Sequence, residues 1–295
     1  MSEPGSPVIA SRPRSKASRS KAWTAYTADP LSVVGLVIVV AIVLLAVFAP
    51  FVTPYPDHVG PIGDFAAMTA APSGDYWFGT DMVGRDLFTR ILYGYRLSLI
   101  MAIVVLAIAT PIGVIVGLVA GYKGGWTDYI LMRITDVFLA VPPLVLAMAI
   151  MGFLEPTLLN GMLAITAMWW PWYARLIYNV TRAEAQEGYV LAAETVGAST
   201  AHILFREILP NCWPSILTKM TLDVGFVILM ASSLSFLGLG VQPPTPDLGS
   251  MVADGAKYMP DAWWLTIFPA LAILLIVLGF NLVGDGLREA FEAES

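Results

Sequence analysis

The sequence predicts an all-α membrane protein with six transmembrane helices, and three observations support that prediction. Of the 295 residues, 57% are hydrophobic and only 13% are charged, whereas soluble domains contain about 25% charged residues. The mean hydropathy of the chain is +0.74. Several apolar runs also reach the roughly 20 helical residues that are needed to cross a bilayer.

The rarer residue types exclude several other classes of protein. Cys212 is the only cysteine, which rules out a disulfide framework and a cysteine-rich metal site. His58 and His202 lie far apart in the sequence and form no metal-ligand pattern. The net charge of −6 comes without a basic domain, so the composition gives no argument for nucleic-acid binding.

The chain begins with a polar segment, 1–28, whose five basic residues lie among serines and prolines. Such a segment buries too little apolar surface to fold alone, so we predict a disordered cytoplasmic tail. The following run, Leu31–Val52, is longer than the apolar region of a signal peptide, which indicates an uncleaved anchor. We expect a first unit at 29–94, comprising this helix and a periplasmic segment, and a five-helix core at 95–295.

Five further apolar runs predict the helices of the core. Tyr129–Leu154 carries two charged residues near its start, and Pro214–Gly238 carries another two. Leu159–Val180 contains a cluster of tryptophans. Two tryptophans at the start of the last run are typical of an aromatic belt at the membrane interface. The predicted spans are Leu97–Gly121, Tyr129–Leu154, Leu159–Val180, Pro214–Gly238 and Trp263–Val283.

The distribution of lysine and arginine over the connecting segments predicts that both termini are cytoplasmic, because basic residues gather on the inner side of a membrane. The two outer segments, 53–94 and 241–262, are instead rich in aspartate. The largest inner loop is then 181–212. The basic residues assigned to the inside are the five of the tail with Lys123, Arg182, Arg206 and Arg288, against Arg85, Arg90, Lys257 and the boundary residue Arg96.

This inner loop has the residues of two short helices, although it is expected to lie in water. Arg182–Val196 consists mostly of good helix formers, with Gly188 as its weak point. Gly197 suits a left-handed helix stop. Ser199 or Thr200 can then cap a second helix.

Pro210 disfavours helical geometry in the residue before it, so we predict that the second helix ends there. Ala192 and Ala193 have short side chains, so another protein can closely approach this face of the first helix. A turn and two caps have little to bury by themselves, which favours a docking element over a solvated connection between two spans.

The loop resembles the cytoplasmic "EAA" loop of binding-protein-dependent ABC importer permeases. In that family the loop carries a coupling helix that sits in a groove of a separate ATPase subunit. Leu191 departs from the family pattern because a glutamate is usual there, and Glu194 or Glu187 is expected to take over its role. Glu207 stands where an isoleucine is frequent. The resemblance implies a coupling function for Leu191, Ala192, Ala193, Glu194, Gly197, Ala198, Ser199, Ile208, Leu209 and Pro210.

Three other stretches resemble the C-type permease subunit of the dipeptide, oligopeptide and nickel branch of this family. Phe78–Leu99 is similar to its outer segment and second-helix entry, and Ser235–Gly255 is similar to its outer loop after the fifth helix. Asn281–Phe291 is similar to its carboxyl-terminal signature. Leu248 departs from the tryptophan that many relatives have. The resemblance covers about residues 24–292.

The resemblance implies a type I ABC importer permease fold in the bacterial inner membrane and a subunit without catalytic activity. The chain has no G-x-x-x-x-G-K-[ST] phosphate loop, so ATP and Mg are expected on partner subunits. The implied partners are a second permease, two ATPase subunits, a periplasmic binding protein and membrane lipid. Small peptides are the expected cargo, with nickel chelates, glutathione and opine-like conjugates as alternatives.

Two pairs of charged residues lie within the predicted spans. Lys219 and Asp223 are four residues apart and Arg133 and Asp136 three apart, so the members of each pair can meet on one helix face. Charged groups within a membrane usually face a cavity or the bundle interior. A structural ion pair is the favoured interpretation for both pairs, and lining of the translocation path is the alternative.

A compact polar cluster is predicted outside the membrane, before the second span. Its two glycines permit turns that other residues resist. The cluster is either a contact surface for an external binding protein or a lid, or it is a self-contained loop closed by an Asp–Arg pair. The residues of this outer cluster are Gly79, Thr80, Asp81, Gly84, Arg85 and Asp86.

Two functions of other classes fit the sequence less well. An intramembrane aspartyl protease needs two carboxylates that share one site, and Asp136 and Asp285 lie near helix ends without the G-x-G-D motif of such proteases. A carrier that acts alone usually has inverted repeats with broken helices, and the sequence shows no such repeat.

Overall fold

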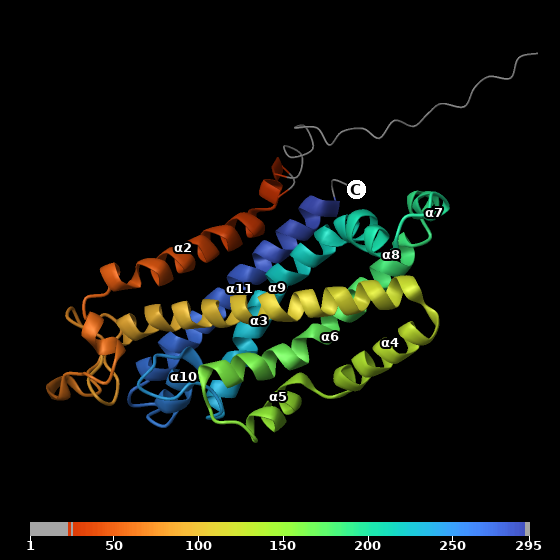
Figure 1. Cartoon of the computed structure of the whole chain (residues 1–295). Helices are drawn as coiled ribbons and strands as arrows, with labels where there is room; N and C mark the ends of the chain where they lie inside the picture. Colours follow the sequence, from red (N-terminus) through yellow and green to blue (C-terminus); the bar gives the residue numbers. More distant parts are fainter. Residues whose placement is uncertain (1–22, 25, 293–295) are drawn as a thin grey trace, which may run out of the picture.

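The computed structural model describes residues 23, 24 and 26–292, and within this part the chain is almost entirely helical (Figure 1). An isolated bridge between Thr80 and Asp86 is the only β-type pairing in the described part. The all-α fold is therefore confirmed. The long helices, which run side by side in Figure 1, are α2 (Pro30–Val52), α3 (Leu87–Lys123), α6 (Leu158–Glu184), α9 (Leu209–Phe236) and α11 (Trp264–Glu292).

Four described helices are long and apolar enough to cross a membrane, and a fifth span results if one bent pair is counted. This pair consists of α4 (Gly125–Ala140) and α5 (Pro143–Met151), which are bent by 87°. Val141 and Pro142 each precede a proline and are extended, as that position favours. The predicted third span is thus broken, and α6 is not among the four apolar helices, so the count of six remains a prediction.

The helices begin earlier or end later than the apolar runs predict. α3 starts at Leu87 instead of Leu97, because the Asp86 carboxylate caps it by accepting a 2.8 Å hydrogen bond from the amide of Thr89. α11 continues past the predicted end at Val283 to Glu292. The polar residues at the start of α3 and at the end of α11 are therefore helical, although their low hydropathy excludes them from the predicted spans.

Most of the predicted tail, 1–28, lies outside the described residues. Its described part is helical and folded against α2, since the Tyr26 hydroxyl donates a 3.0 Å hydrogen bond to the carbonyl of Ser32. Trp23, Thr24 and 26–28, which belong to the predicted tail, are thus helical in the described part of the chain.

α3 packs against α6 along a row of glycines spaced four residues apart. A Cβ atom added at Gly113 would lie 2.4 Å from the carbonyl oxygen of Trp170, and one at Gly117 would lie 2.6 Å from that of Ala174. Gly121 continues the row. Lipid provides no hydrophobic drive between helices, so close backbone approach of this kind is what holds the pair together. These two helices form the α3–α6 pair.

A second group of helices is packed by glycines in the same way. A Cβ added at Gly225 of α9 would lie 3.2 Å from the carbonyl of Val277 in α11. Gly35 brings α2 against α11, where a Cβ would lie 2.4 Å from the Cβ of Leu282. α2, α9 and α11 therefore form a second group of closely packed helices, the α2–α9–α11 group.

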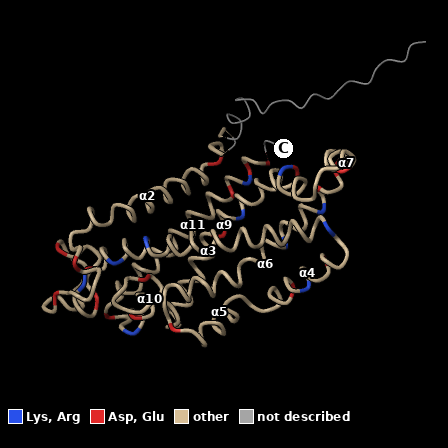
Figure 2. Tube along the Cα trace, in the orientation of Figure 1, with Lys and Arg blue, Asp and Glu red and all other residues tan. Residues whose placement is uncertain are grey.

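The polar segments lie at the two opposite ends of the bundle, and Figure 2 shows that most charged residues gather there. One end carries α7 (Gly188–Thr195), α8 (Thr200–His202) and the π-helical turn η3 (Ile203–Ile208), which we call the elbow (Figure 1). The other end carries α10 (Leu248–Ala256) and the segment 53–86 with η1 (Pro56–Val59) and η2 (Phe65–Ala67), which we call the lobe. The predicted inner and outer loops thus lie at opposite ends.

The glycine row of α3 generates a prediction about stability. Gly117→Val is expected to destabilise the protein by about 1–3 kcal/mol, because the new side chain collides with the backbone of α6. Gly161→Ala in α6 is the control, since its Cβ would meet only the end of Met101 at 4.0 Å. Thermal unfolding in detergent measures both, and equal unfolding temperatures for the two variants would contradict this packing.

Candidate functional site

The elbow begins with α7, whose end has the geometry expected from the sequence. Gly197 adopts a φ of +80°, in the left-handed region. Its amide donates to the carbonyl of Glu194 at 2.9 Å, and the amide of Ala198 donates to the carbonyl of Ala193 at 3.0 Å. These two bonds form a Schellman motif, which satisfies the last carbonyls of the helix. The predicted stop at Gly197 is confirmed.

The second helix of the elbow starts as predicted but does not end at Pro210. The Ser199 hydroxyl caps it by accepting from the amide of His202 at 3.3 Å. The chain then forms the π-helical turn η3, where the amide of Leu209 bonds to the carbonyl of Leu204, five residues earlier. This wider turn accommodates a proline that lacks an amide hydrogen. Thr200–Phe236 is consequently one continuous span, which joins the elbow to α9.

The elbow has a small hydrophobic core of its own, contrary to the expectation that it has little to bury. Val190 of α7 and Ile203 of η3 are fully buried. They pack with Leu118 of α3 and Ile177 of α6 in one cluster. The elbow is therefore fixed to the ends of the long helices, so it moves with them.

Tyr189 adds a polar link between the helices that enter and leave the elbow. Its hydroxyl donates to the Glu184 carboxylate at 2.5 Å and accepts from the Asn211 amide at 2.8 Å. Burial and the bond to Glu184 raise the pKa of Tyr189 to about 12, so the phenol stays protonated at neutral pH. The end of α6 and the start of α9 are thus joined through α7.

The opposite face of α7 is uncovered and partly apolar. Leu191 is 52% exposed and Val196 is 83% exposed, and the short side chain of Ala192 lies between them in the sequence. Glu194 accepts a 2.7 Å hydrogen bond from Tyr122 of α3. Of the predicted coupling residues, Ile208 is buried, Ala193, Ala198 and Leu209 are half-buried, and Leu191, Ala192, Glu194, Gly197, Ser199 and Pro210 are exposed.

The outer cluster is a self-contained loop, which was one of the two interpretations of its sequence. The Asp81 carboxylate receives the Arg85 guanidinium at 2.6 Å and the Arg90 guanidinium at 3.5 Å. Thr80, Asp81 and Asp86 are buried, and Gly84 packs directly onto the backbone of Asp64. Most of the cluster is therefore enclosed within the lobe, and only Arg85 is half-buried.

The two predicted intramembrane pairs have different outcomes. Lys219 binds the Asp223 carboxylate at 3.0 Å, so this pair is confirmed. The pairing of Arg133 with Asp136 is wrong, because Asp136 pairs with Arg175 of α6. The Arg133 guanidinium instead lies 5.3 Å from the ring centroid of Tyr129, one turn earlier on the same helix. The partner of Asp136 lies on a neighbouring helix, so the spacing of residues along α4 does not predict it.

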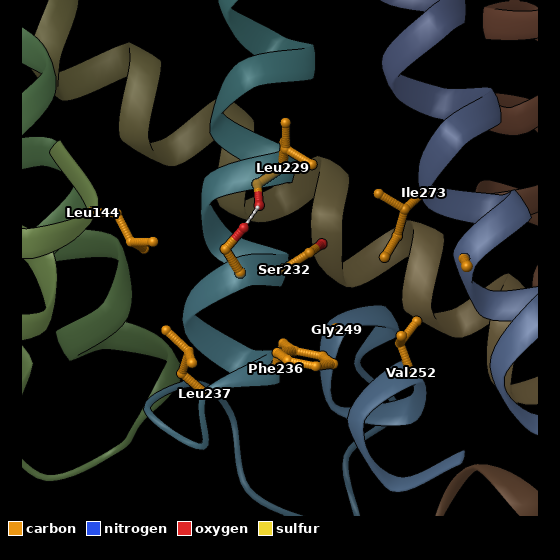
Figure 3. A pocket seen from close by; sticks show the side chains of 10 residues that line it. Leu144, Leu229, Ser232, Phe236, Leu237, Gly249, Val252 and Ile273 are labelled. Carbon is orange, nitrogen blue, oxygen red and sulfur yellow. Dashed lines mark hydrogen bonds between the residues drawn. The ribbon is translucent and has the colours of Figure 1, made fainter. Parts of the chain in front are cut away.

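An apolar pocket of about 410 Å³ opens between α5, α9, α10 and α11 (Figure 3). Leu144 of α5 faces it from one side and Ile273 of α11 from the other. Phe236 and Val252 line it near the end that carries α10. A second pocket of about 360 Å³ includes Arg133 and Asp136. Neither pocket was predicted: the first is formed by residues distant in sequence, and the second lies along α4, whose packing on its neighbours decides which side chains stay open.

Sequence reasoning also missed the glycine row of α3 and the ion pair of Arg175. The row has a visible signal, since Gly113, Gly117 and Gly121 follow a small-xxx-small spacing within an apolar run. Arg175 is a charged residue inside a predicted span, which is itself a signal. Its partner could be found only from the packing of α4 on α6.

Comparison with known protein families gives two matches along the chain. Residues 113–294 match the family described as "Binding-protein-dependent transport system inner membrane component". Residues 19–72 match the "N-terminal TM domain of oligopeptide transport permease C". The first match alone covers more than half of the chain.

Individual relatives are similar over nearly their whole length. The chain is 43% identical to the probable D,D-dipeptide transport system permease protein of Escherichia coli (strain K12), over 90% of this chain and 89% of that protein. It is 39% identical to the dipeptide transport system permease protein of Alkalihalophilus pseudofirmus, over 98% and 94% of the two chains. It is 38% identical to the glutathione transport system permease protein of Pectobacterium atrosepticum, over 92% and 89%.

A solved structure supports the fold. The inward-facing MetNI methionine ABC transporter contains a chain that aligns with a TM-score of 0.53 at 18% identity, over 70% of this chain and 95% of that chain. At this identity the likeness concerns the arrangement of helices alone.

The buried outer cluster generates a second prediction about stability. Asp81→Ala is expected to lower the stability by about 3 kcal/mol, because it leaves the buried guanidinium of Arg90 and the half-buried one of Arg85 without their carboxylate. Asp75→Ala, in the exposed part of the lobe, is the matched control. Thermal unfolding in detergent compares them, and an unchanged unfolding temperature for the Asp81 variant would show that the cluster does not hold the lobe.

Proposed function

Because the chain belongs to the family of binding-protein-dependent transport system inner membrane components, we propose that it forms, with a second permease, the path by which an ATP-driven importer takes up small peptides. It is a multi-pass protein of the inner membrane and a non-catalytic subunit. ATP and Mg bind to partner subunits, and a periplasmic binding protein delivers the cargo.

The elbow carries this proposal, because it combines an uncovered face with a rigid support. Val196 and Leu191 are exposed beside the small side chain of Ala192, and apolar surface left open in this way is typical of a protein interface. The Schellman stop at Gly197 and the buried Val190 fix the direction of that face. An ATPase subunit with a groove for a short helix fits such a surface.

The connection of the elbow to the membrane explains how a movement of the ATPases reaches the transport path. Thr200–Phe236 is continuous, so a displacement of α8 shifts the whole of α9. At its far end α9 touches α10, where Gly249 lies against the backbone of Ser232. The elbow and the outer end of the bundle therefore move together, as an alternating-access cycle requires.

Small peptides are the proposed cargo. Relatives named as dipeptide and D,D-dipeptide permeases support this class. The apolar pocket of about 410 Å³ between α5, α9, α10 and α11 offers space for an apolar side chain (Figure 3). Glutathione is a second candidate, since a glutathione permease is 38% identical over 92% of this chain. Glutathione is itself a small peptide, so both candidates use the same chemistry.

The lobe is the proposed contact region for the external binding protein. Apart from the half-buried Arg85, the residues of the outer cluster are buried, but the lobe exposes Ile62, Phe65 and Met68 to solvent. Asp57 is exposed nearby in the sequence. An apolar surface with an acidic residue beside it fits a partner that presents apolar and basic side chains.

The docking role of α7 is tested by placing a large charge on its open face. Ala192→Arg is expected to weaken ATPase binding at least about tenfold while leaving the protein in the membrane, because the new side chain blocks close approach. Ala256→Arg, at another exposed alanine, at the end of the bundle that carries the lobe, is the control. Purification of the tagged chain from native membranes measures the ATPase subunits that come with it.

Two outcomes would contradict the proposed function. If the unmodified chain is purified without any ATPase, it does not work as an importer permease. If the Ala192 variant retains its ATPase and takes up peptide at the unmodified rate, α7 is not the docking element.

A further inference from the structure

The two tightly packed groups of helices meet at a polar contact inside the membrane-spanning part. Glycines bring α3 and α6 into backbone contact, and they do the same for α2, α9 and α11. Between the two groups, α6 faces α9 with Tyr173 opposite Lys219 and Asp223. The rest of the boundary between the groups is largely apolar in the described residues, so this polar contact, which we call the polar seam, is the place where a relative movement would exchange hydrogen bonds.

The polar seam contains an ion pair between a half-buried lysine and a buried aspartate. Asp223 is only 3% exposed, and its Oδ1 atom receives the Lys219 ammonium at 3.0 Å. The same ammonium lies 5.4 Å from the ring centroid of Tyr173. Since a charge inside a membrane needs such partners, Tyr173 of α6 contributes to holding the pair of α9 in place.

Three polar atoms at this seam are buried without a hydrogen-bond partner within the described residues. They are the Asp223 Oδ2 atom, the Tyr173 hydroxyl and the Thr110 hydroxyl of α3. Thr110 lies one turn before Gly113, which packs directly on Tyr173. Lys219, the partner of Asp223, lies over the Tyr173 ring. A buried polar atom that lacks a partner is unfavourable, and lipid offers no replacement for the missing bond. A small shift of the α3–α6 pair along α9 would let the phenol bond to Asp223, or leave it to bond to Thr110 within its own pair.

The seam lies close to the helices that lead into and out of the elbow. α6 enters the elbow and α9 leaves it, so a displacement of the elbow acts on both sides of Tyr173. Pro111 follows Thr110 directly, and Pro171 lies two residues before Tyr173. Each of these prolines removes a hydrogen bond from its own helix, which makes a local bend easier at the seam.

We propose that four residues position the helices relative to one another during transport. They are Thr110, Tyr173, Lys219 and Asp223. They form the joint at which the α3–α6 pair moves against the α2–α9–α11 group. The Tyr173 hydroxyl donates to Asp223 in one state of the cycle and bonds to Thr110 in the other. Lys219 stays on Asp223 and keeps its charge paired in both states. This inference rests on the proposed function, because it concerns the coupling of ATP hydrolysis to uptake.

The first test removes only the phenolic oxygen. Tyr173→Phe in the complete importer, reconstituted in vesicles with its ATPases and binding protein, is expected to lower peptide uptake at least about fivefold. ATP hydrolysis should continue, since the elbow and its partners are intact. Tyr95→Phe, another buried tyrosine of the bundle, is the matched control and should transport at the unmodified rate.

A second variant keeps the test informative if the phenylalanine variant assembles poorly. Thr110→Val preserves the shape of the side chain and removes its hydroxyl, and it should also reduce uptake while hydrolysis continues. A structural role would lower abundance, uptake and hydrolysis together. Uptake at the unmodified rate by both variants would overturn the proposal.

Exchanging the two charges distinguishes the proposed joint from an ion pair that has only a structural role. The double variant Lys219→Asp/Asp223→Lys keeps both charges but moves the carboxylate one turn away from its place beside Tyr173. We expect it to assemble better than Asp223→Ala, which leaves Lys219 unpaired, and to remain defective in uptake. Full uptake by the exchanged variant would show that only the ion pair matters.

The reference in every assay is the unmodified importer. If it takes up no peptide in the presence of ATP, the proposed function fails. If it transports peptide and Tyr173→Phe transports at the rate of the Tyr95→Phe control, the importer stands and the joint is wrong.

Discussion

The close approach of α3 to α6 is the contact on which the rest of this structure depends. Inside a bilayer, helices gain no hydrophobic free energy by leaving lipid, so backbone proximity has to hold them together. Gly113 and Gly117 provide it, because any larger side chain would collide with the backbone of α6. This contact positions α6 so that its last turn enters the elbow, and it places Tyr173 against α9.

The elbow is consequently an extension of the membrane helices and not a loop suspended between them. Its core side chains pack on the ends of α3 and α6, and the π-helical turn η3 carries the helix past Pro210 without interruption. A rigid element of this kind transmits a displacement, whereas a flexible loop would absorb it. The same arrangement leaves one face of α7 without cover, and the proposed ATPase contact lies there.

Sequence reasoning succeeded where the deciding interaction is local. The helix stop at Gly197 and the cap at Ser199 follow from bonds within a few residues, and the pairing of Lys219 with Asp223 follows from their spacing on one helix. It failed where a distant residue decides. Asp136 pairs with Arg175 on another helix, and the aspartates of the outer cluster are buried by loop contacts. The resemblance of its motifs was sufficient to identify the family of the chain, but it did not predict which side chains meet in the folded protein.

The central claim is that the open face of α7 is held by an ATPase subunit. A photoreactive amino acid at Val196, the C-cap residue of α7, tests it most directly, because this side chain is 83% exposed. Irradiation of cells should yield an adduct of this chain with an ATPase, identified by mass spectrometry, and the same label at Trp77 in the lobe should not. The account is contradicted if the label at Val196 gives no protein adduct, or only one with an external binding protein.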